Sequence, residues 1–225
     1  MLKFIKNRVR EFLDIYFDQG KEKRSTYQRI IPLPPGQRYK FDLVVKDVNS
    51  KDVGTASFSI NVPRYGGSDL QSSTIILANS INPAPTNATT LEQYIIGDLR
   101  IVPNVKKEYI SGRVQNLAPY MQIYGIEIDQ ATRNPSLDVE FVIKKGSEIL
   151  EVIPGSAENS EQLYYGDRVV LIGRIPVGKL APGNYQLEIR VLDKISNKRL
   201  ATTEDFIVKE PPPNPLFAAI EGDGD

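Results

Sequence analysis

The chain has 225 residues, enough for one large domain or two domains of about 100 residues each. Its 28 basic and 28 acidic residues balance, so the total charge does not favour nucleic acid or an anionic membrane as a partner. Cysteine, histidine and tryptophan are absent, which excludes disulfides, a thiol nucleophile, a Ser-His-Asp triad, an imidazole acid–base pair and a Cys/His zinc site.

The N-terminal segment carries two competing patterns. Apolar residues recur at helical spacing from Leu2 to Tyr16, whereas the stretch from Leu13 to Phe17 also alternates as a β-strand does. We expect a short helix to Arg8 and a strand after it. Charged residues interrupt the segment throughout, so we expect neither the apolar core of a signal peptide nor a membrane span.

Two stretches of the chain repeat one pattern: LPPGQRYKFDLVVKDVNS at residues 33–50 and LAPGNYQLEIRVLDKISN at residues 180–197. With Gln37 as one extra residue in the first copy, the alignment pairs Leu33 with Leu180, Tyr39 with Tyr185, Asp47 with Asp193 and Val62 with Val208. Alternate residues after each tyrosine are apolar, which predicts a half-buried strand, and a polar turn then leads to a second strand. Each copy therefore predicts a β-hairpin, and the repeat predicts two similar domains.

A Pro-Gly step precedes each repeated tyrosine and turns the chain sharply. Tyr39 and Tyr185 then enter their strands close to that corner. This is the arrangement of the tyrosine corner of immunoglobulin-like sandwiches, in which the phenol hydroxyl bonds to upstream backbone. A plain turn followed by a core tyrosine is the alternative for either single copy, but the repetition favours two structural tyrosine corners.

The first module, which we place at residues 1–82, offers only four strand-like segments: VREFLDIYF, TYQRIIPL, YKFDLVVKD and ASFSINV. One face of their sheet carries large apolar side chains, and burying each is worth about 1.5–3 kcal/mol. Three covers are possible: strands upstream of this chain, the stretch SSTIILA, or the N-terminal segment folded as a helix. The sequence leaves open whether this module is complete.

Residues 83–99 begin with PAPTNATT, a stretch rich in Pro, Ala and Thr, and this composition predicts a linker. About seven strand-like segments follow within residues 100–210, the count and spacing of an immunoglobulin or fibronectin type III sandwich. Residues 211–225 form a proline-rich exit and an acidic tail, which we expect to be disordered. The predicted fold class is all-β, with two tandem immunoglobulin/fibronectin III-like β-sandwich domains.

Three stretches carry a resemblance to a known family: GDLRIVPNVKKEY, DQATRNPSLDVEFVIKKGSEI and LAPGNYQLEIRVLDKISNKRLATTEDFIV. With them, most of residues 33–208 resembles the tandem immunoglobulin-like regions of bacterial GWxTD-motif proteins and of related secreted proteins with von Willebrand A domains. The chain departs from that family because it has neither the GWxTD motif nor a metal-ion adhesion motif. The resemblance implies a bacterial, extracytoplasmic (periplasmic, cell-surface or secreted), non-catalytic segment of a longer polypeptide.

Calcium is the one metal that the composition leaves open, since its oxygen ligands need neither His nor Cys. The stretch DVNSKDVG offers Asp47, Asn49 and Asp52. An EF-hand loop, however, has Gly at its sixth position and Glu at its twelfth, where this chain has Asp52 and Phe58. A hairpin turn is the favoured interpretation, so we predict no metal and no cofactor.

Hydrolysis by a carboxylate pair needs only two acidic side chains beside a cleft. Asp138 and Glu140 occupy alternate positions of a predicted strand, with Glu148 and Glu151 nearby. Solvated strand faces routinely carry such pairs, because charged residues are mostly exposed. We therefore predict no catalytic residues and no enzyme activity.

Tyr164 and Tyr165 lie beside a polar loop, where they could stack on a sugar ring or anchor a protein partner. Because successive strand residues point to opposite faces, we expect at least one of them in the core. The predicted function is a structural or protein-interaction module that contacts a protein partner or adjacent domains of a longer chain. A carbohydrate-binding module with a glycan ligand is the first alternative and a carboxylate-dependent hydrolase the second; we expect no nucleic acid and no membrane contact.

Overall fold

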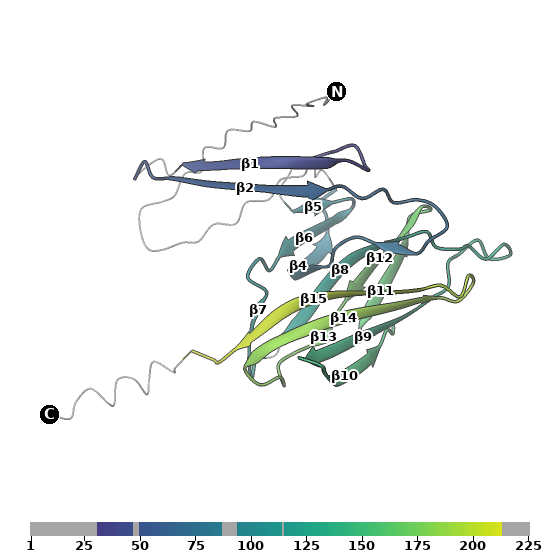
Figure 1. Cartoon of the computed structure of the whole chain (residues 1–225). Coiled ribbons are helices and arrows are strands. Elements are labelled where there is room, and N and C mark those ends of the chain that lie inside the picture. The colour runs from purple at the N-terminus through teal and green to yellow at the C-terminus, as the bar shows by residue number, and fades with distance from the viewer. Residues whose placement is uncertain (1–30, 47–49, 87–93, 114, 213–225) are drawn as a thin grey trace, which may run out of the picture. The chain divides into compact units, whose positions relative to one another are not determined.

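The computed structural model describes residues 31–46, 50–86, 94–113 and 115–212. The described residues form β-strands and turns and contain no helix (Figure 1). They divide into two compact units, residues 1–65 and residues 66–225. The predicted N-terminal helix, the strand after it and the acidic tail lie outside the described residues.

The first unit, in its described part, is one antiparallel hairpin of β1 (Arg38–Lys46) and β2 (Val53–Asn61). Both strands lie where period-two alternation predicted them. The register sets Phe41 opposite Phe58, and their rings stack with centroids 5.3 Å apart. For this module, the described residues thus supply a hairpin rather than a sandwich.

The division between the units falls earlier in the chain than the expected boundary at residue 82. The stretch SSTIILA forms β3 (Gln71–Ser72) and the start of β4 (Ile76–Pro83), and both strands pair with β8 of the second unit. This stretch, one of the three possible covers for the first sheet, therefore takes its strand partner from the second unit. Its apolar residues alternate between two buried clusters on opposite faces, so the segment needs a position that is covered on both sides.

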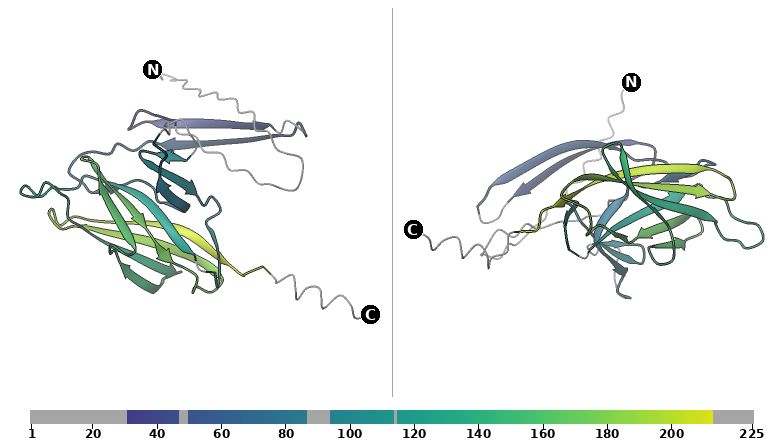
Figure 2. Two further views of the ribbon diagram at one scale, coloured as in Figure 1. Left: turned by 180° about the vertical axis from the view of Figure 1, so that it is seen from behind. Right: turned by 90° about the horizontal axis from the view of Figure 1, so that it is seen from below.

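The second unit is a sandwich of two sheets (Figures 1 and 2). The five-stranded sheet, in the order β10-β9-β14-β15-β7, consists of β7 (Glu108–Ile110), β9 (Leu137–Lys145), β10 (Glu148–Pro154), β14 (Gly183–Asp193) and β15 (Arg199–Lys209). The eight-stranded sheet follows the order β11-β12-β8-β4-β6-β5, with β3 and β13 also paired to β8. Its remaining strands are β5 (Ile95–Ile96), β6 (Leu99–Pro103), β8 (Asn116–Tyr124), β11 (Ser160–Tyr164), β12 (Arg168–Gly173) and β13 (Ile175–Pro176).

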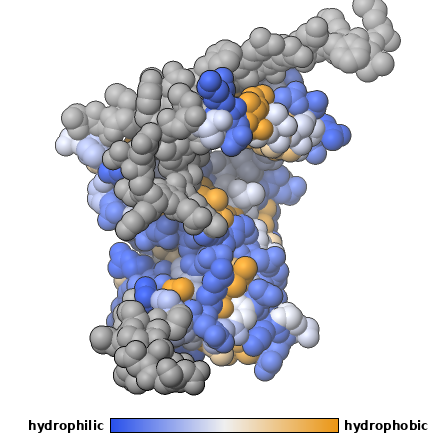
Figure 3. Space-filling view, turned by 90° about the vertical axis from the view of Figure 1, so that its left-hand side faces the viewer, coloured by the Kyte–Doolittle hydropathy of each residue, from blue (hydrophilic) through white to orange (hydrophobic). Residues whose placement is uncertain are grey.

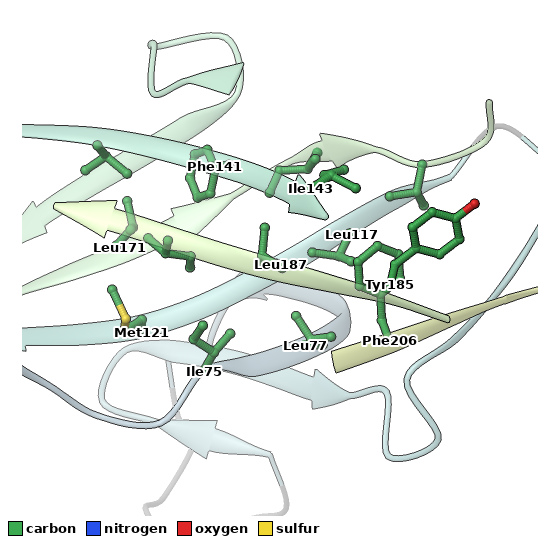
Figure 4. Close-up of a cluster of buried hydrophobic side chains, with 14 of the residues drawn as sticks. Ile75, Leu77, Leu117, Met121, Phe141, Ile143, Leu171, Tyr185, Leu187 and Phe206 are labelled. Carbon is green, nitrogen blue, oxygen red and sulfur yellow. The ribbon is translucent and has the colours of Figure 1, made fainter. Parts of the chain in front are cut away.

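The main core lies between these two sheets (Figure 4). Phe141 and Leu187 of the five-stranded sheet pack in one cluster with Met121 and Leu171 of the eight-stranded sheet, and all four are fully buried. Burial alternates along β14, as the sequence pattern predicted. The all-β, immunoglobulin-like fold class is therefore confirmed. The expected linker is partly structured, because its last described residues form β5 and the first residue of β6.

A second apolar cluster lies on the outer face of the eight-stranded sheet, away from the main core. It consists of Ala78, Leu99, Ile101, Tyr120, Val170 and Ile172. Strand β4 pairs with β8 from Ile76 to Ala78 and with β6 from Ala78 to Pro83, and the β6 pairing has a register shift between Ala78 and Ser80. Residues of β6 thereby pack with side chains of β8 and β12, so both faces of those strands are covered.

The two repeated hairpins are built alike, each in its own unit. Tyr39 pairs with Ile60 and Tyr185 pairs with Phe206, which are equivalent residues in the alignment. The turn of each hairpin also has one residue at the same aligned position with a left-handed backbone, with φ of 64° at Lys51 and 58° at Asn197. The duplication seen in the sequence is therefore a duplication of backbone geometry.

Candidate interaction site

Each repeated tyrosine forms a hydrogen bond with the backbone of the turn that precedes its strand. The Tyr39 hydroxyl donates to the Pro34 carbonyl oxygen at 3.0 Å, and the Tyr185 hydroxyl donates to the Ala181 carbonyl oxygen at 2.7 Å. Pro34 and Ala181 occupy the same place in the alignment, so the two bonds are equivalent. This is the hydrogen bond by which a tyrosine corner is defined. Because both hydroxyls serve the backbone, the two residues have a structural role in this geometry.

Tyr164 and Tyr165 are exposed at the end of β11 and in the turn that follows it. Their exposed fractions are 36% and 39%. The expectation that one of them would lie in the core is wrong, because the strand ends at Tyr164 and strict alternation does not extend to Tyr165 in the turn. The Tyr164 hydroxyl donates to the Gly166 carbonyl oxygen at 2.7 Å. That bond fixes the ring at the surface.

Tyr165 is held from three sides. Its hydroxyl donates to Asp98 Oδ1 at 2.6 Å, its backbone N–H donates to the Arg168 carbonyl oxygen at 2.9 Å, and the Arg168 guanidinium lies 5.4 Å from its ring centroid. The hydrogen bond to Asp98, with a smaller contribution from burial, raises the pKa of Tyr165 to about 12. The bond also ties the turn between β5 and β6 to the turn between β11 and β12.

A chain of polar side chains follows the outer face of β8 beside this tyrosine. Tyr120, Gln122 and Tyr124 share that face because they occupy alternate strand positions. Gln122 Nε2 donates to the Tyr120 hydroxyl oxygen at 2.5 Å, and the Tyr124 hydroxyl donates to Gln122 Oε1. Burial raises the pKa of Tyr120. Sequence reasoning missed this row, although the alternation in YMQIY, with apolar residues between the polar ones, was the signal for it.

The acidic residues considered for hydrolysis lie on the solvated face of the five-stranded sheet. Asp138 Oδ1 is 2.9 Å from Lys194 Nζ, and Glu140 Oε2 is 3.7 Å from Arg190 Nη1. Their neighbour Glu188 pairs with Lys144 and Arg190, and the hydrogen bond from Lys144 lowers its pKa. Each carboxylate is thus neutralised across the strands, which is the arrangement of a stabilised exposed face.

The other two candidate acids, Glu148 and Glu151, are exposed on the edge strand β10. A groove with a volume of ≈ 310 Å³ lies elsewhere, beside β11, and is lined by Ala157, Ser160, Glu161, Gln162, Ile172 and Arg174. It contains a single carboxylate, so it does not bring together the acid pair that glycoside hydrolysis uses.

Among the residues that the structure describes, no group of three or more acidic side chains could hold a metal ion. Two of the considered calcium ligands, Asp47 and Asn49, lie outside the described part of the chain. The third, Asp52, donates its backbone N–H to Ser50 Oγ at 3.2 Å, which is a turn interaction. No helix long and apolar enough to cross a membrane occurs in the described residues.

Comparison with known proteins gives no family. No protein-family model matches the chain, and no curated protein matches it. Among solved structures, the chain is similar to one described as "Anomalous substructure of Titin-A168169", with 8% sequence identity and a TM-score of 0.23. That match covers 71% of this chain and 57% of the other chain. The immunoglobulin-like fold is defined by the two sheets of the second unit and the core between them.

Proposed function

We propose that the chain is a non-catalytic structural or protein-interaction module of a bacterial extracytoplasmic protein, and that Tyr164 and Tyr165 contact its partner. The bacterial and extracytoplasmic parts of this proposal rest on the sequence resemblance alone. Two features favour binding over catalysis: the candidate acids are ion-paired on a solvated face, and the groove beside β11 has one carboxylate. Neither the ion-paired face nor the groove supplies the two carboxylates beside a cleft that hydrolysis needs.

The proposal rests on two neighbouring aromatic rings that are exposed to solvent and whose orientation is fixed by hydrogen bonds. Each hydroxyl already donates to an acceptor within the fold, to Gly166 for Tyr164 and to Asp98 for Tyr165. The rings therefore lose little conformational freedom when a partner covers them, which reduces the entropic cost of binding. Tyrosine is also among the residues most enriched at the energetic centres of protein interfaces.

Photocrosslinking tests this proposal, because it captures a bound partner of any identity. Benzoylphenylalanine would replace Tyr164, and in a second variant Tyr165, in the full chain expressed in the cells that produce it. Thr203 provides a matched control, because it is exposed on β15 in the ion-paired face of the other sheet. We expect a discrete adduct with one protein or one adjacent domain from position 164 or 165, and none from position 203.

Two results would count against the proposal. One is the absence of a discrete adduct from both tyrosine positions. The other is hydrolysis of a glycan or peptide substrate by the wild-type chain that disappears in Asp138→Asn or Glu140→Gln, because that activity would make the chain a carboxylate-dependent hydrolase.

A carbohydrate ligand is the second candidate, favoured by the same exposed rings, since aromatic faces stack on sugars. One face of Tyr165 is occupied by Arg168, which leaves the opposite face for stacking. Binding to a glycan array that is lost in Tyr164→Ala or Tyr165→Ala, but retained in the corresponding phenylalanine variants, would favour the glycan. An adduct with protein and no array signal would favour the protein partner.

A further inference from the structure

The chain between the two units is held by its own unit on either side of a short segment. On the side of the first unit, the Gly36 N–H donates to the Val62 carbonyl oxygen at 2.8 Å, and the Val62 N–H donates to the Gln37 carbonyl oxygen at 2.9 Å. The Arg64 side chain lies beside Gly36. These contacts all lie within the first unit, so they fix the residues that follow β2 to their own hairpin.

On the side of the second unit, three successive residues are attached to the sandwich. Lys198 Nζ donates to the Ser68 carbonyl oxygen. The Asp69 carbonyl oxygen lies so close to Gly125 that a Cβ atom on that glycine would be 2.0 Å away from it. Leu70 packs against the main core. The chain is therefore held from Ser68 onward.

Gly66 and Gly67 lie between these two anchored segments, and the division between the compact units falls directly before them. Both glycines are exposed. Neither donates or accepts a hydrogen bond within the described residues. A Cβ atom on either would meet no described atom within 4 Å, in contrast to Gly125. In the part of the chain that the structure describes, nothing therefore holds or encloses these two residues.

The backbone angles explain why glycine occupies both positions. The angle φ is 127° at Gly66 and 119° at Gly67. Glycine adopts positive φ about as readily as negative φ, whereas a residue with a Cβ atom rarely does so. Because no described atom lies close enough to exclude a side chain, the glycines supply backbone freedom rather than space. Two adjacent glycines thus give the chain its widest range of conformations at the point where it is least held.

We propose that Gly66 and Gly67 form a hinge about which the first unit changes its orientation relative to the second. Hinges are a few loop residues that absorb large changes in φ and ψ, and here the chain on each side of the pair is bonded to its own unit. The hinge is independent of the partner contacts proposed for Tyr164 and Tyr165, because the bonds that fix those two rings lie wholly within the second unit.

The hinge sets the direction in which the first hairpin presents its apolar face. That face includes Leu43 and Val45, which have exposed fractions of 47% and 60%, whereas the aligned residues Ile189 and Val191 are buried in the main core. Figure 3 shows part of the apolar surface of the first hairpin as orange atoms near the top of the view. A change of φ and ψ at two residues therefore turns an apolar surface without breaking a described hydrogen bond of either unit.

Double electron–electron resonance on the full chain measures this motion, because it records the distribution of distances between two spin labels whatever the rate at which conformations interconvert. The chain has no cysteine, so engineered cysteines are the only labelled sites. Thr55→Cys on β2 and Thr203→Cys on β15 place one exposed label on each unit. Gln162→Cys with Thr203→Cys is the control pair, because both labels then lie on the second unit, on its two sheets.

We expect a broad distance distribution for labels at positions 55 and 203 and a narrow one for labels at positions 162 and 203. The double substitution Gly66→Pro and Gly67→Pro should narrow the first distribution, because proline fixes φ at about −65° and stiffens the chain. It removes no described hydrogen bond, since neither glycine N–H donates one. The control distribution should stay the same in the proline variant, which establishes that the sandwich is intact.

Backbone ¹⁵N relaxation of the wild-type chain locates the motion. We expect order parameters below about 0.6 at Gly66 and Gly67, the range of flexible backbone, and about 0.85 at Leu70 and Gly125, the value of rigid backbone. Gly125 is the matched glycine, because it also has a positive φ but the Asp69 carbonyl oxygen closes the space beside it.

Three outcomes would overturn the proposal. A distribution for positions 55 and 203 that is as narrow as the control would show that the two units keep one orientation. A broad distribution that the two prolines leave unchanged would place the hinge elsewhere in the chain. Order parameters of about 0.85 at both glycines would show that this segment is held. None of these results bears on the crosslinks expected from Tyr164 and Tyr165, so the two proposals fail independently.

Discussion

Asp193 is the described residue whose replacement we expect to be most informative about the second unit. Its carboxylate is fully buried at the end of β14. Oδ1 accepts hydrogen bonds from the backbone N–H groups of Ile195 at 3.0 Å and Ser196 at 3.4 Å. Oδ2 accepts from the Glu127 N–H at 2.9 Å and the Ser196 hydroxyl at 2.7 Å. One side chain therefore holds the hairpin turn and fastens it to the segment after β8.

Asp193→Asn keeps the shape of the side chain but replaces one acceptor oxygen with a donor. In its best orientation the new amide group faces the Glu127 N–H, while the Ser196 hydroxyl can rotate to accept. One buried N–H then lacks a partner, which costs about 1–3 kcal/mol. The bonds that remain also lose the strength that a charged acceptor gives them. We expect a total loss of about 2–4 kcal/mol in the free energy of unfolding.

The same carboxylate predicts a pH dependence. Burial alone would raise its pKa, but the hydrogen bonds, led by that from Glu127, outweigh burial and hold the pKa below the ordinary value of 3.8. A depressed pKa in the folded state gives stability that is present above pH 3.8 and is lost as the pH falls through the folded value. The pKa of Glu188 is also lowered, so Glu188 likewise makes the free energy of unfolding fall as the pH falls. Asp193→Asn should therefore reduce the dependence of the free energy of unfolding on acid pH without abolishing it.

Urea denaturation followed by tyrosine fluorescence measures both effects, since the chain has no tryptophan. Asp205→Asn is the matched control, because Asp205 is exposed on the adjacent strand β15. It should change the free energy of unfolding by less than about 0.5 kcal/mol. If Asp193→Asn proved as mild as this control, or if its acid slope equalled that of the wild type, the carboxylate would not hold the turn as argued.

Three further outcomes follow from the second unit. Tyr185→Phe removes the corner hydrogen bond and should lower the free energy of unfolding by about 0.5–1.5 kcal/mol in urea denaturation; no change would mean that the bond is not formed in solution. Gly125→Ala should cost about 2–5 kcal/mol, since φ is 69° and the new Cβ would lie 2.0 Å from the Asp69 carbonyl oxygen; full stability would contradict that close approach. Asp98→Asn should lower the pKa of Tyr165 from about 12 toward 10.0 in a tyrosinate absorbance titration, and an unchanged pKa would exclude the hydrogen bond as its cause.

Local patterns predicted the local structure well. Period-two alternation located β1, β2, β14 and β15, because a half-buried strand must alternate its side chains. The SSTIILA stretch was harder to place. Its apolar residues lie on both faces of the strand, and a short segment of this kind fits any sheet position that is covered on both sides. The pairing that decides the matter, between β4 and β8, joins residues far apart in the chain, and no short-range pattern encodes it.

The candidate site shows the same limit. Alternation assigned one residue of the Tyr164–Tyr165 pair to the core, but it applies only as far as a strand continues, and β11 ends at Tyr164. The partner that orients Tyr165 is Asp98, which comes from another turn. The sequence therefore indicated which aromatic residues to consider, while the acceptors that fix their rings depend on how distant turns meet.

The repeat separates what a hairpin sequence specifies from what its surroundings supply. Register, turn geometry and the corner hydrogen bond are the same in both copies, so they follow from the local sequence. Burial differs, because the second hairpin has β9, β7 and a facing sheet, whereas no described strand pairs with either edge of the first hairpin. Among the described residues, the hairpin that forms part of the core in the second unit therefore presents its apolar face as exposed side chains in the first.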